Sequence, residues 1–282
     1  MDRKRPEEVA RLMIAAVRQQ LARRGRVLFL RGAASGILFG ISAHLALVAA
    51  LATGQPLIGA AAAPIGLVAA ILLDLELVTG SFGFIPLGWL RQEASARSVM
   101  SNYGWVFLGN LFGAAGYGTL IAIVLAMAKS GNLPSVGEQL VAVAEARTLG
   151  YAASGAAGLV TAFVKAILCN WMACLAVLLA MSTTSALGKV VVVWMVGFAF
   201  FAQDFEHAVI NMFMIPTGMM LGAKVSMVEW WFWNQIPVVL GNLVGGLLFT
   251  DAAFHLLIGS ALSGVDPECR AKRTSRRFPD ST

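Results

Sequence analysis

The heptapeptide LGNLFGA, Leu108 to Ala114, recurs as LGNLVGG, Leu240 to Gly246. Each copy follows an interrupted apolar segment by a similar interval, which predicts that the two halves of the chain repeat one design. Small residues at this spacing let neighbouring helices approach closely. The alternative is a chance match, because the chain is rich in glycine and leucine.

The composition is that of a membrane protein, because 58% of the residues are hydrophobic and 13% are charged. About 20 apolar residues cross a bilayer as a helix. Full-length apolar runs lie at roughly 32–52, 104–128, 152–183, 187–203 and 235–263, and shorter ones lie near 57–73 and 208–222. We therefore predict an all-α membrane protein with six transmembrane helices, of which the second and the fifth are broken.

Three spans in each half require the second half to enter the membrane from the opposite side. The sequence thus predicts an aquaporin-like inverted repeat, about 29–128 and 152–263. The breaks are expected at DLELVTGSFGF, Asp74 to Phe84, and at AQDFEH, Ala202 to His207. Broken helices are tolerated in a bilayer where they line a cavity, so both breaks are expected near the midplane. In the first break, turn or helix-capping roles are expected for Thr79, Gly80, Ser81 and Gly83.

Basic residues at both ends of the chain predict its orientation, because lysine and arginine accumulate on the cytoplasmic side. Residues 1–28 are predicted to form an amphipathic cytoplasmic helix at the lipid headgroups. Residues 29–265 form the pore domain, and 266–282 form a basic tail that is expected to be disordered. Both termini are placed in the cytoplasm of a bacterium, inside its inner membrane, with 129–151 and 223–234 as loops on the other side. The net charge of +6 then reflects orientation and anionic lipid, not nucleic acid.

Glu206 and His207 stand side by side in the second break. An ionisable residue at membrane depth usually faces a pathway or a partner, so His207 is predicted to face the pathway. The alternative is a core histidine bonded to Thr79 or to a backbone carbonyl. Glu206 is predicted to support the broken helix, by capping its restart or by anchoring the loop. We find no pattern of a nucleophile, a metal cluster or a phosphate loop, and we therefore expect no enzyme activity, no cofactor and no metal.

Three stretches carry a family resemblance: FEHAVINMFMIPTG from Phe205, ILCNWMACLAV from Ile167 and IPVVLGNLVGG from Ile236. Together they resemble the formate/nitrite transporter family, over nearly the whole chain. The resemblance implies a homopentamer with one pore in each protomer. It also implies passage of small monovalent anions such as formate, nitrite or hydrosulfide.

Site residues follow from the resemblance. Its pore-centre residues match His207, Thr79, Asn170 and Asn242. Its constriction residues match Phe200, Leu67, Leu77 and Val78, while Ala63 stands where a bulkier constriction residue is common. Ser154 stands where many members carry a vestibule lysine. Lys165 lies eleven residues further on, roughly 16 Å at helical rise, and is not expected to replace that charge; Arg147 is the other nearby basic residue.

The predicted function is a channel or transporter for formate, nitrite or their acids, with hydrosulfide, acetate and lactate as further candidates. Apolar constrictions admit a neutral acid far more readily than its anion. His207 is predicted to link transport to protons, because an imidazole exchanges protons near neutral pH. The alternative is that His207 only donates a hydrogen bond while the proton comes from bulk water. The expected partners are the anion or weak acid, protons, membrane lipid and four further copies of the chain.

Two alternatives stay open at this point. A channel for neutral small solutes on the same fold is favoured by Ser154 and Ala63. A membrane-embedded redox subunit would need histidines paired across facing helices to hold a haem. His44, His207 and His255 fit no such pair in the repeat.

Overall fold

The computed structural model of the protein describes residues 3–128 and 135–263, without the side chains of residue 251 and of residues 254–263. The described elements are helices, together with one isolated β-bridge between Arg3 and Thr183. The expected all-α class is confirmed for this part of the chain. The predicted tail, 266–282, lies outside the described residues.

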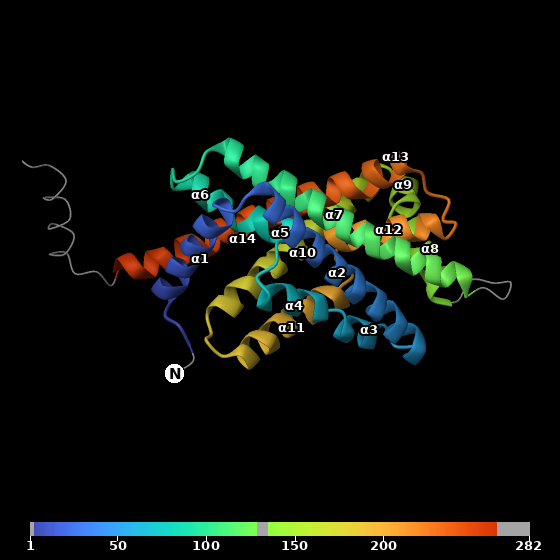
Figure 1. The fold of residues 1–282 in the computed structure, drawn as a ribbon, viewed down its shortest axis with the longest axis horizontal. Helices are drawn as coiled ribbons and strands as arrows, with labels where there is room; N and C mark the ends of the chain where they lie inside the picture. Colours follow the sequence, from blue (N-terminus) through green and yellow to red (C-terminus); the bar gives the residue numbers. More distant parts are fainter. Residues whose placement is uncertain (1–2, 129–134, 264–282) are drawn as a thin grey trace, which may run out of the picture.

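Four helical stretches among the described residues are long and apolar enough to cross a membrane. They are α2 (Gly25–Thr53), α7 (Ala96–Met127), α10 (Ala156–Met181) and the run Met227–Thr250. The last combines α13 (Met227–Trp230), a π-helical turn, η1 (Trp231–Gln235), and most of α14 (Ile236–Ser263). Shorter helices fill the space between them (Figure 1): α3 (Pro56–Ala62), α4 (Ile65–Leu72), α5 (Val78–Phe84), α6 (Pro86–Leu90), α11 (Ala186–Ala202) and α12 (Ala208–Met220).

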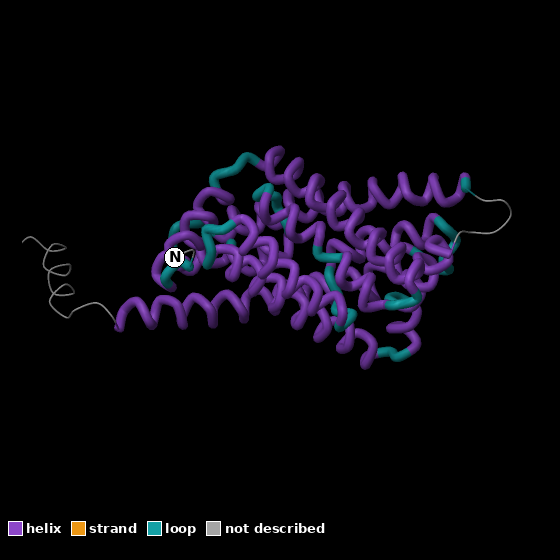
Figure 2. Tube along the Cα trace, turned by 90° about the horizontal axis from the view of Figure 1, so that it is seen from below, coloured by secondary structure: helices purple, strands orange, loops and turns teal. Residues whose placement is uncertain are grey.

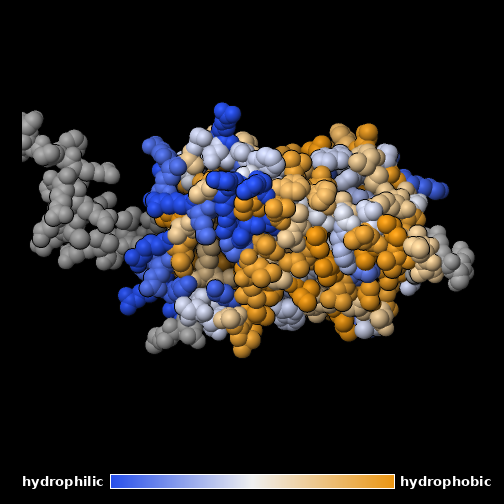
Figure 3. Space-filling view, viewed as in Figure 1, coloured by the Kyte–Doolittle hydropathy of each residue, from blue (hydrophilic) through white to orange (hydrophobic). Residues whose placement is uncertain are grey.

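The molecule is elongated, and its two ends differ. Helix α1 (Pro6–Leu21) lies at the end toward which α14 runs, while α8 (Ser135–Ala146) and α9 (Leu149–Ala153) lie at the other end. The helices between them are closely packed in both views (Figure 2). Hydrophilic residues gather near α1, and apolar residues cover much of the middle of the visible face (Figure 3). Such an apolar surface suits a lipid environment.

Helix α1 packs its apolar face against protein. Val9, Met13 and Val17 are buried in a cluster with Ile85 and Leu87, which flank and form part of α6. The amphipathic pattern expected for this segment is present, but its apolar stripe covers other helices rather than lipid headgroups. Helix α1 therefore forms part of the folded protein.

Two segments expected as loops are partly helical. The stretch 129–151 contains α8, in which Leu140 and Ala144 are fully buried, and 223–234 contains α13 and most of η1. Helix α8 forms because this buried face packs against α12, where Gly218 lies directly against the Leu140 carbonyl. The first break is also shorter than expected, because Thr79, Gly80, Ser81 and Gly83 lie inside α5 and form no turn.

The repeated glycines bring long helices together in both halves. Gly113 of α7 lies against the carbonyl oxygen of Ala33 in α2, and Gly245 of α14 lies against that of Ile167 in α10. A Cβ atom at either glycine would overlap the carbonyl oxygen, so a larger residue would push the helices apart. The same motif thus packs α7 on α2 and α14 on α10, which argues against a chance match.

Candidate functional site

Each half of the chain has a gap between two helices that the motif asparagine bridges. The first gap, residues 73–77, separates α4 from α5, and the second gap, residues 203–207, separates α11 from α12. The Val78 amide donates to Asn110 Oδ1 at 2.9 Å, and the Ala208 amide donates to Asn242 Oδ1 at 2.9 Å. A buried helix start needs such acceptors. The asparagine therefore fixes where each second helix begins.

The side-chain NH2 groups of these asparagines repeat the symmetry. Each donates to one carbonyl of a long helix and to one carbonyl of a gap. The distances are 2.9 Å to Gly32 and 3.0 Å to Glu76 for Asn110, and 2.8 Å to Ala166 and 3.1 Å to Glu206 for Asn242. Asn110 was not among the residues expected at the pore centre. It holds the same place in the repeated motif as Asn242, and this equivalence could have predicted its role.

Asn170 joins the first half to the second. Its Nδ2 donates to the backbone oxygen of Thr79 at 3.0 Å and to that of Asn242 at 2.6 Å. All three residues are buried. Asn170 thus holds the start of α5 beside α14, and this contact sets the position of Thr79.

Thr79 and His207 meet at the centre of the molecule. They lie 128 residues apart in sequence, yet Thr79 Oγ1 is 3.4 Å from His207 Nε2, and both side chains are buried. The imidazole stacks on Phe39, at 5.0 Å between ring centroids, and on Phe200, at 6.2 Å. Its Nδ1 has no hydrogen-bond partner among the described residues. A fully satisfied core histidine would have a partner on both nitrogens.

The expected constriction residues differ in burial and in what they contact. Phe200, Leu67, Val78 and Ala63 are buried, and Leu77 is half-buried. Leu67, Leu77 and Thr79 line one cavity, whereas the Ala63 carbonyl accepts a hydrogen bond from Ser42 Oγ in α2. Leu67 and Leu77 therefore face open space, while Ala63 is packed between helices.

That cavity, which we call the α1 mouth, measures about 400 Å³ and is bordered by α1, Arg23, Asp74, Glu76 and Leu77. Arg23 forms ion pairs with both Asp74 and Glu76. Nη2 of Arg31 lies 2.8 Å from Asp74 Oδ2. Arg23, Asp74 and Glu76 thus line the same cavity as Thr79, and Arg31 binds Asp74 without being part of that lining.

A second cavity, which we call the α8 mouth, measures about 700 Å³ and is lined by Arg147, Tyr151, Lys165, Asp204 and Phe205, among others. Nη2 of Arg147 lies 2.6 Å from Asp204 Oδ1, and Nζ of Lys165 lies 3.0 Å from Asp204 Oδ2. Two cations and a carboxylate therefore border this cavity, and Glu206 lies behind them.

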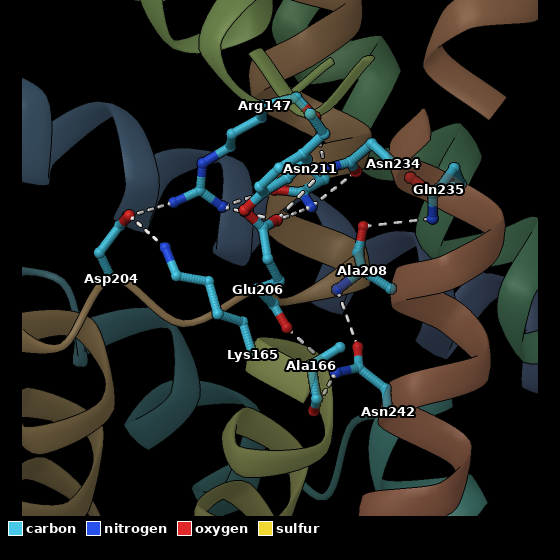
Figure 4. Close-up of polar contacts among 11 residues, drawn as sticks. Arg147, Lys165, Ala166, Asp204, Glu206, Ala208, Asn211, Asn234, Gln235 and Asn242 are labelled. Atoms are coloured by element: carbon cyan, nitrogen blue, oxygen red, sulfur yellow. Dashed lines mark hydrogen bonds and ion pairs between the residues drawn. The ribbon is translucent and has the colours of Figure 1, made fainter. Parts of the chain in front are cut away.

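Glu206 is a fully buried carboxylate with four donors (Figure 4). Its Oε2 accepts hydrogen bonds from Arg147 Nη1 at 3.0 Å, from Asn211 Nδ2 at 2.6 Å and from Asn234 Nδ2 at 3.3 Å. Its Oε1 accepts one from the Tyr151 hydroxyl at 2.7 Å. Its side chain does not cap α12, whose first amide binds Asn242 instead. These contacts anchor the second gap, because they tie Glu206 to side chains of α12, η1 and the segment from Arg147 to Tyr151.

Ser154 lies away from this cluster. It is exposed at the end of α9, its Oγ is 3.4 Å from the Gly150 carbonyl, and it does not line the α8 mouth as described above. The positive charges there come from Arg147 at the end of α8 and from Lys165 in α10. Lys165 therefore places its charge in this cavity and not at the position of Ser154, and the expectation that it does not replace a charge at Ser154 stays a prediction.

Comparison with known proteins agrees with this arrangement. A family model described as formate/nitrite transporter matches residues 7–256. The chain belongs to this family. It is 41% identical over 202 residues to a probable formate transporter of Methanothermobacter thermautotrophicus, covering 68% of this chain and 71% of that protein. It is 28% identical over 259 residues to a formate channel of Bacillus thuringiensis, covering 89% of this chain and 94% of that protein.

Solved structures of family members share the fold. A pentameric formate channel with formate bound aligns with a TM-score of 0.68 and 25% identity, over 83% of this chain and 97% of that one. An ion channel of the same family aligns with a TM-score of 0.74 and 25% identity, over 88% and 97%. These relatives are named transporters and channels, so the chain is a membrane transport protein and not an enzyme.

Proposed function

We propose that this membrane protein carries formate, nitrite or a similar small monovalent anion through a pore centred on His207 and Thr79. The observation that carries the proposal is their contact at 3.4 Å inside an apolar shell, where Nδ1 of the imidazole has no partner among the residues that the structure describes. Hydrosulfide, acetate and lactate are further candidates. The similarity to a pentameric formate channel with formate bound supports both the anion and a homopentamer.

The helix pairs around the gaps complete the six spans in this proposal. Helices α3 and α4 with α5 and α6 form one broken span, and α11 with α12 forms another. The equivalent contacts of Asn110 and Asn242 support two repeats of opposite orientation. The basic residues near both termini favour a cytoplasmic location for both, in a bacterial inner membrane.

Transport follows from charge and burial. Arginine and lysine side chains at the mouths can donate hydrogen bonds to an anion, and the start of α12 next to His207 adds partial positive charge. Apolar residues, including Leu67 and Phe200, oppose passage of an ion that has lost its water. A protonated His207 transfers a proton to the anion, which crosses as the neutral acid, and the imidazole then takes a new proton from water. One proton moves with each anion.

A channel for neutral solutes is the competing proposal. It rested on Ser154, which leaves the usual position of the vestibule lysine uncharged. Arg147 and Lys165 border the α8 mouth, and their N–H groups can donate to an anion there, although Asp204 and Glu206 balance their charges. The buried packing of Ala63 gives no support to a wider pore.

The test is stopped-flow flux into liposomes that hold the purified protein and a lumenal pH dye. Formate, nitrite, hydrosulfide, acetate and lactate are compared, with glycerol as an osmotic control. We expect a rapid pH change with formate or nitrite that empty liposomes lack. Fast glycerol relaxation without any acid response would instead establish the neutral-solute channel.

The His207→Phe variant tests the centre of the pore. It removes the proton carrier while keeping a flat ring between Phe39 and Phe200, so we expect acid flux to be lost with assembly retained. His44→Phe is the matched control. It makes the same substitution at a histidine that contacts Tyr117 in α7 and is not the partner of Thr79. Unchanged flux in His207→Phe would refute the role of this histidine.

A further inference from the structure

The two mouths contain matching charge clusters built from the same short motif. Asp74-Leu75-Glu76 in the first gap corresponds to Asp204-Phe205-Glu206 in the second. Both aspartates adopt left-handed backbone conformations, with φ of 53° and 51°. This conformation is uncommon outside glycine, although aspartate tolerates it better than most residues. Glycine would adopt this backbone conformation without strain. The presence of aspartate at both positions therefore calls for a role of its carboxylate.

Each cluster divides its two carboxylates between two environments. Glu76 is 4% exposed and Glu206 is 0% exposed, whereas Asp74 is 68% and Asp204 is 69% exposed. One arginine, Arg23 or Arg147, pairs with both acids of its cluster. Breaking a buried pair is far more costly than breaking an exposed one. The aspartate is therefore the exchangeable partner, and the glutamate is the fixed one.

The second cation of each cluster serves mainly the exposed aspartate. Nζ of Lys165 binds Asp204 at 3.0 Å, and Nη2 of Arg31 binds Asp74 at 2.8 Å. The buried glutamate balances one positive charge and the aspartate balances the other. Moving the aspartate away would leave two cations, one glutamate and one net positive charge in each cluster.

We propose that Asp74 and Asp204 are tethered counter-anions that occupy the anion sites of the two mouths until an entering anion displaces them. The site at the α8 mouth consists of Arg147 Nη2 and Lys165 Nζ, and the site at the α1 mouth consists of Arg23 and Arg31. A carboxylate fills each site already, so the ligand is a small monovalent anion of similar shape and charge, such as formate. This inference rests on the proposed function.

The consequence is that the aspartates set the affinity of the mouths. An anion gains the contacts to the two cations only by replacing an attached carboxylate, which has a high effective concentration because it cannot diffuse away. Half-saturation therefore requires a high anion concentration. This weak binding is useful in a channel, because an anion that binds too tightly at the mouth leaves slowly.

The test is the concentration dependence of formate flux in liposomes. The double variant Asp74→Asn with Asp204→Asn alters both mouths, so its result does not depend on how the protein is oriented in the bilayer. We expect the half-saturating formate concentration to fall at least threefold, and chloride to inhibit the variant more strongly than the unaltered protein. Single variants should give part of the effect.

Two controls separate the charge at the site from other causes. Glu7→Gln with Glu138→Gln removes the same net charge from residues of α1 and α8 that belong to neither cluster, and should leave half-saturation unchanged. Asp74→Gly with Asp204→Gly relieves the left-handed backbone, and should match the asparagine variant if displacement of charge is the cause.

Half-saturation within twofold of the unaltered protein in both the asparagine and the glycine variants would overturn the inference while transport persists. Opposite shifts in these two variants would also overturn it, because backbone strain would then be the cause. Absence of formate flux in the unaltered protein would instead contradict the proposed function. The two failures are thus distinguishable.

Discussion

Asn110 and Asn242 perform the same task in the two halves of the chain, because each accepts a 2.9 Å hydrogen bond from the first amide of the helix after a gap. Each also donates to a carbonyl of its own gap. Buried backbone groups outside regular structure need such partners. Each gap is stabilised because one side chain binds both a backbone carbonyl of the gap and the first amide of the helix that follows it.

Replacing Asn242 with leucine should strongly destabilise the protein. The change leaves the Ala208 amide and the carbonyls of Ala166 and Glu206 without their partner, and each unsatisfied buried group costs about 1–3 kcal/mol. We expect the free energy of unfolding to fall by about 3 kcal/mol or more, measured by unfolding in detergent. Thr119→Ala, which removes an exposed hydroxyl from α7, should change it by less than about 0.5 kcal/mol. An equal effect of both substitutions would contradict this role.

The hydroxyl of Thr79 should matter for transport through its contact with His207. Thr79→Val keeps the shape and removes the hydrogen bond, which is worth about 0.5–1.5 kcal/mol. We expect formate flux to fall roughly two- to tenfold, and Thr79→Ser to retain most of it. Thermal unfolding of both variants shows whether the fold is kept. Equal flux in the valine and serine variants would show that the hydroxyl is not used.

Arg147 and Lys165 should differ in their effect on stability, although both bind Asp204. Arg147→Gln leaves Glu206 buried without its cation, and losing one partner of a buried ion pair costs about 3–5 kcal/mol. Lys165→Gln breaks a largely exposed pair worth at most about 1 kcal/mol. Unfolding in detergent measures both. Adding Glu206→Gln to Arg147→Gln should restore part of the loss, and a further loss would contradict the pairing.

Much of the fold was predictable because apolar runs and the repeated motif are local patterns. The expected runs match the long helices, and the resemblance named Thr79 and His207, which the structure brings into contact. Residues held by tertiary geometry were harder to find. Arg147 follows α8 and binds Glu206, which lies 59 residues further along the chain. Residue spacing within a single helix, such as α10, cannot predict a contact of this kind.

Asn234 shows a second limit of the sequence. It binds Glu206 from η1, where one π-helical turn shifts the side chains around the helix axis. Helical periodicity carries no sign of such a turn. Tryptophans dominate this segment of the sequence, and nothing in the local pattern marks Asn234 as a partner of Glu206.

Ser154 should contribute little to transport. Its side chain is exposed, contacts the Gly150 carbonyl and is not part of the lining of the α8 mouth. We expect Ser154→Ala to change formate flux by less than twofold, whereas Lys165→Gln should alter half-saturation. A large effect of Ser154→Ala with no effect of Lys165→Gln would show that the serine position forms the vestibule after all.

The contact between α1 and the loop after α6 should depend on pH. Nε and Nη2 of Arg18 each lie 2.8 Å from a Glu93 carboxylate oxygen, and the hydrogen bond to this guanidinium lowers the pKa of Glu93 from 4.5 to about 2. A depressed pKa in the folded state gives stability that is present above the ordinary value and is lost as the pH falls through about 2. The pair is exposed, so the effect on the melting temperature should be at most a few degrees. We expect the unaltered protein to melt above Glu93→Gln at pH 7, and the difference to shrink between pH 4 and pH 2. A difference that grows on acidification would show that Arg18 does not stabilise the charged form of Glu93.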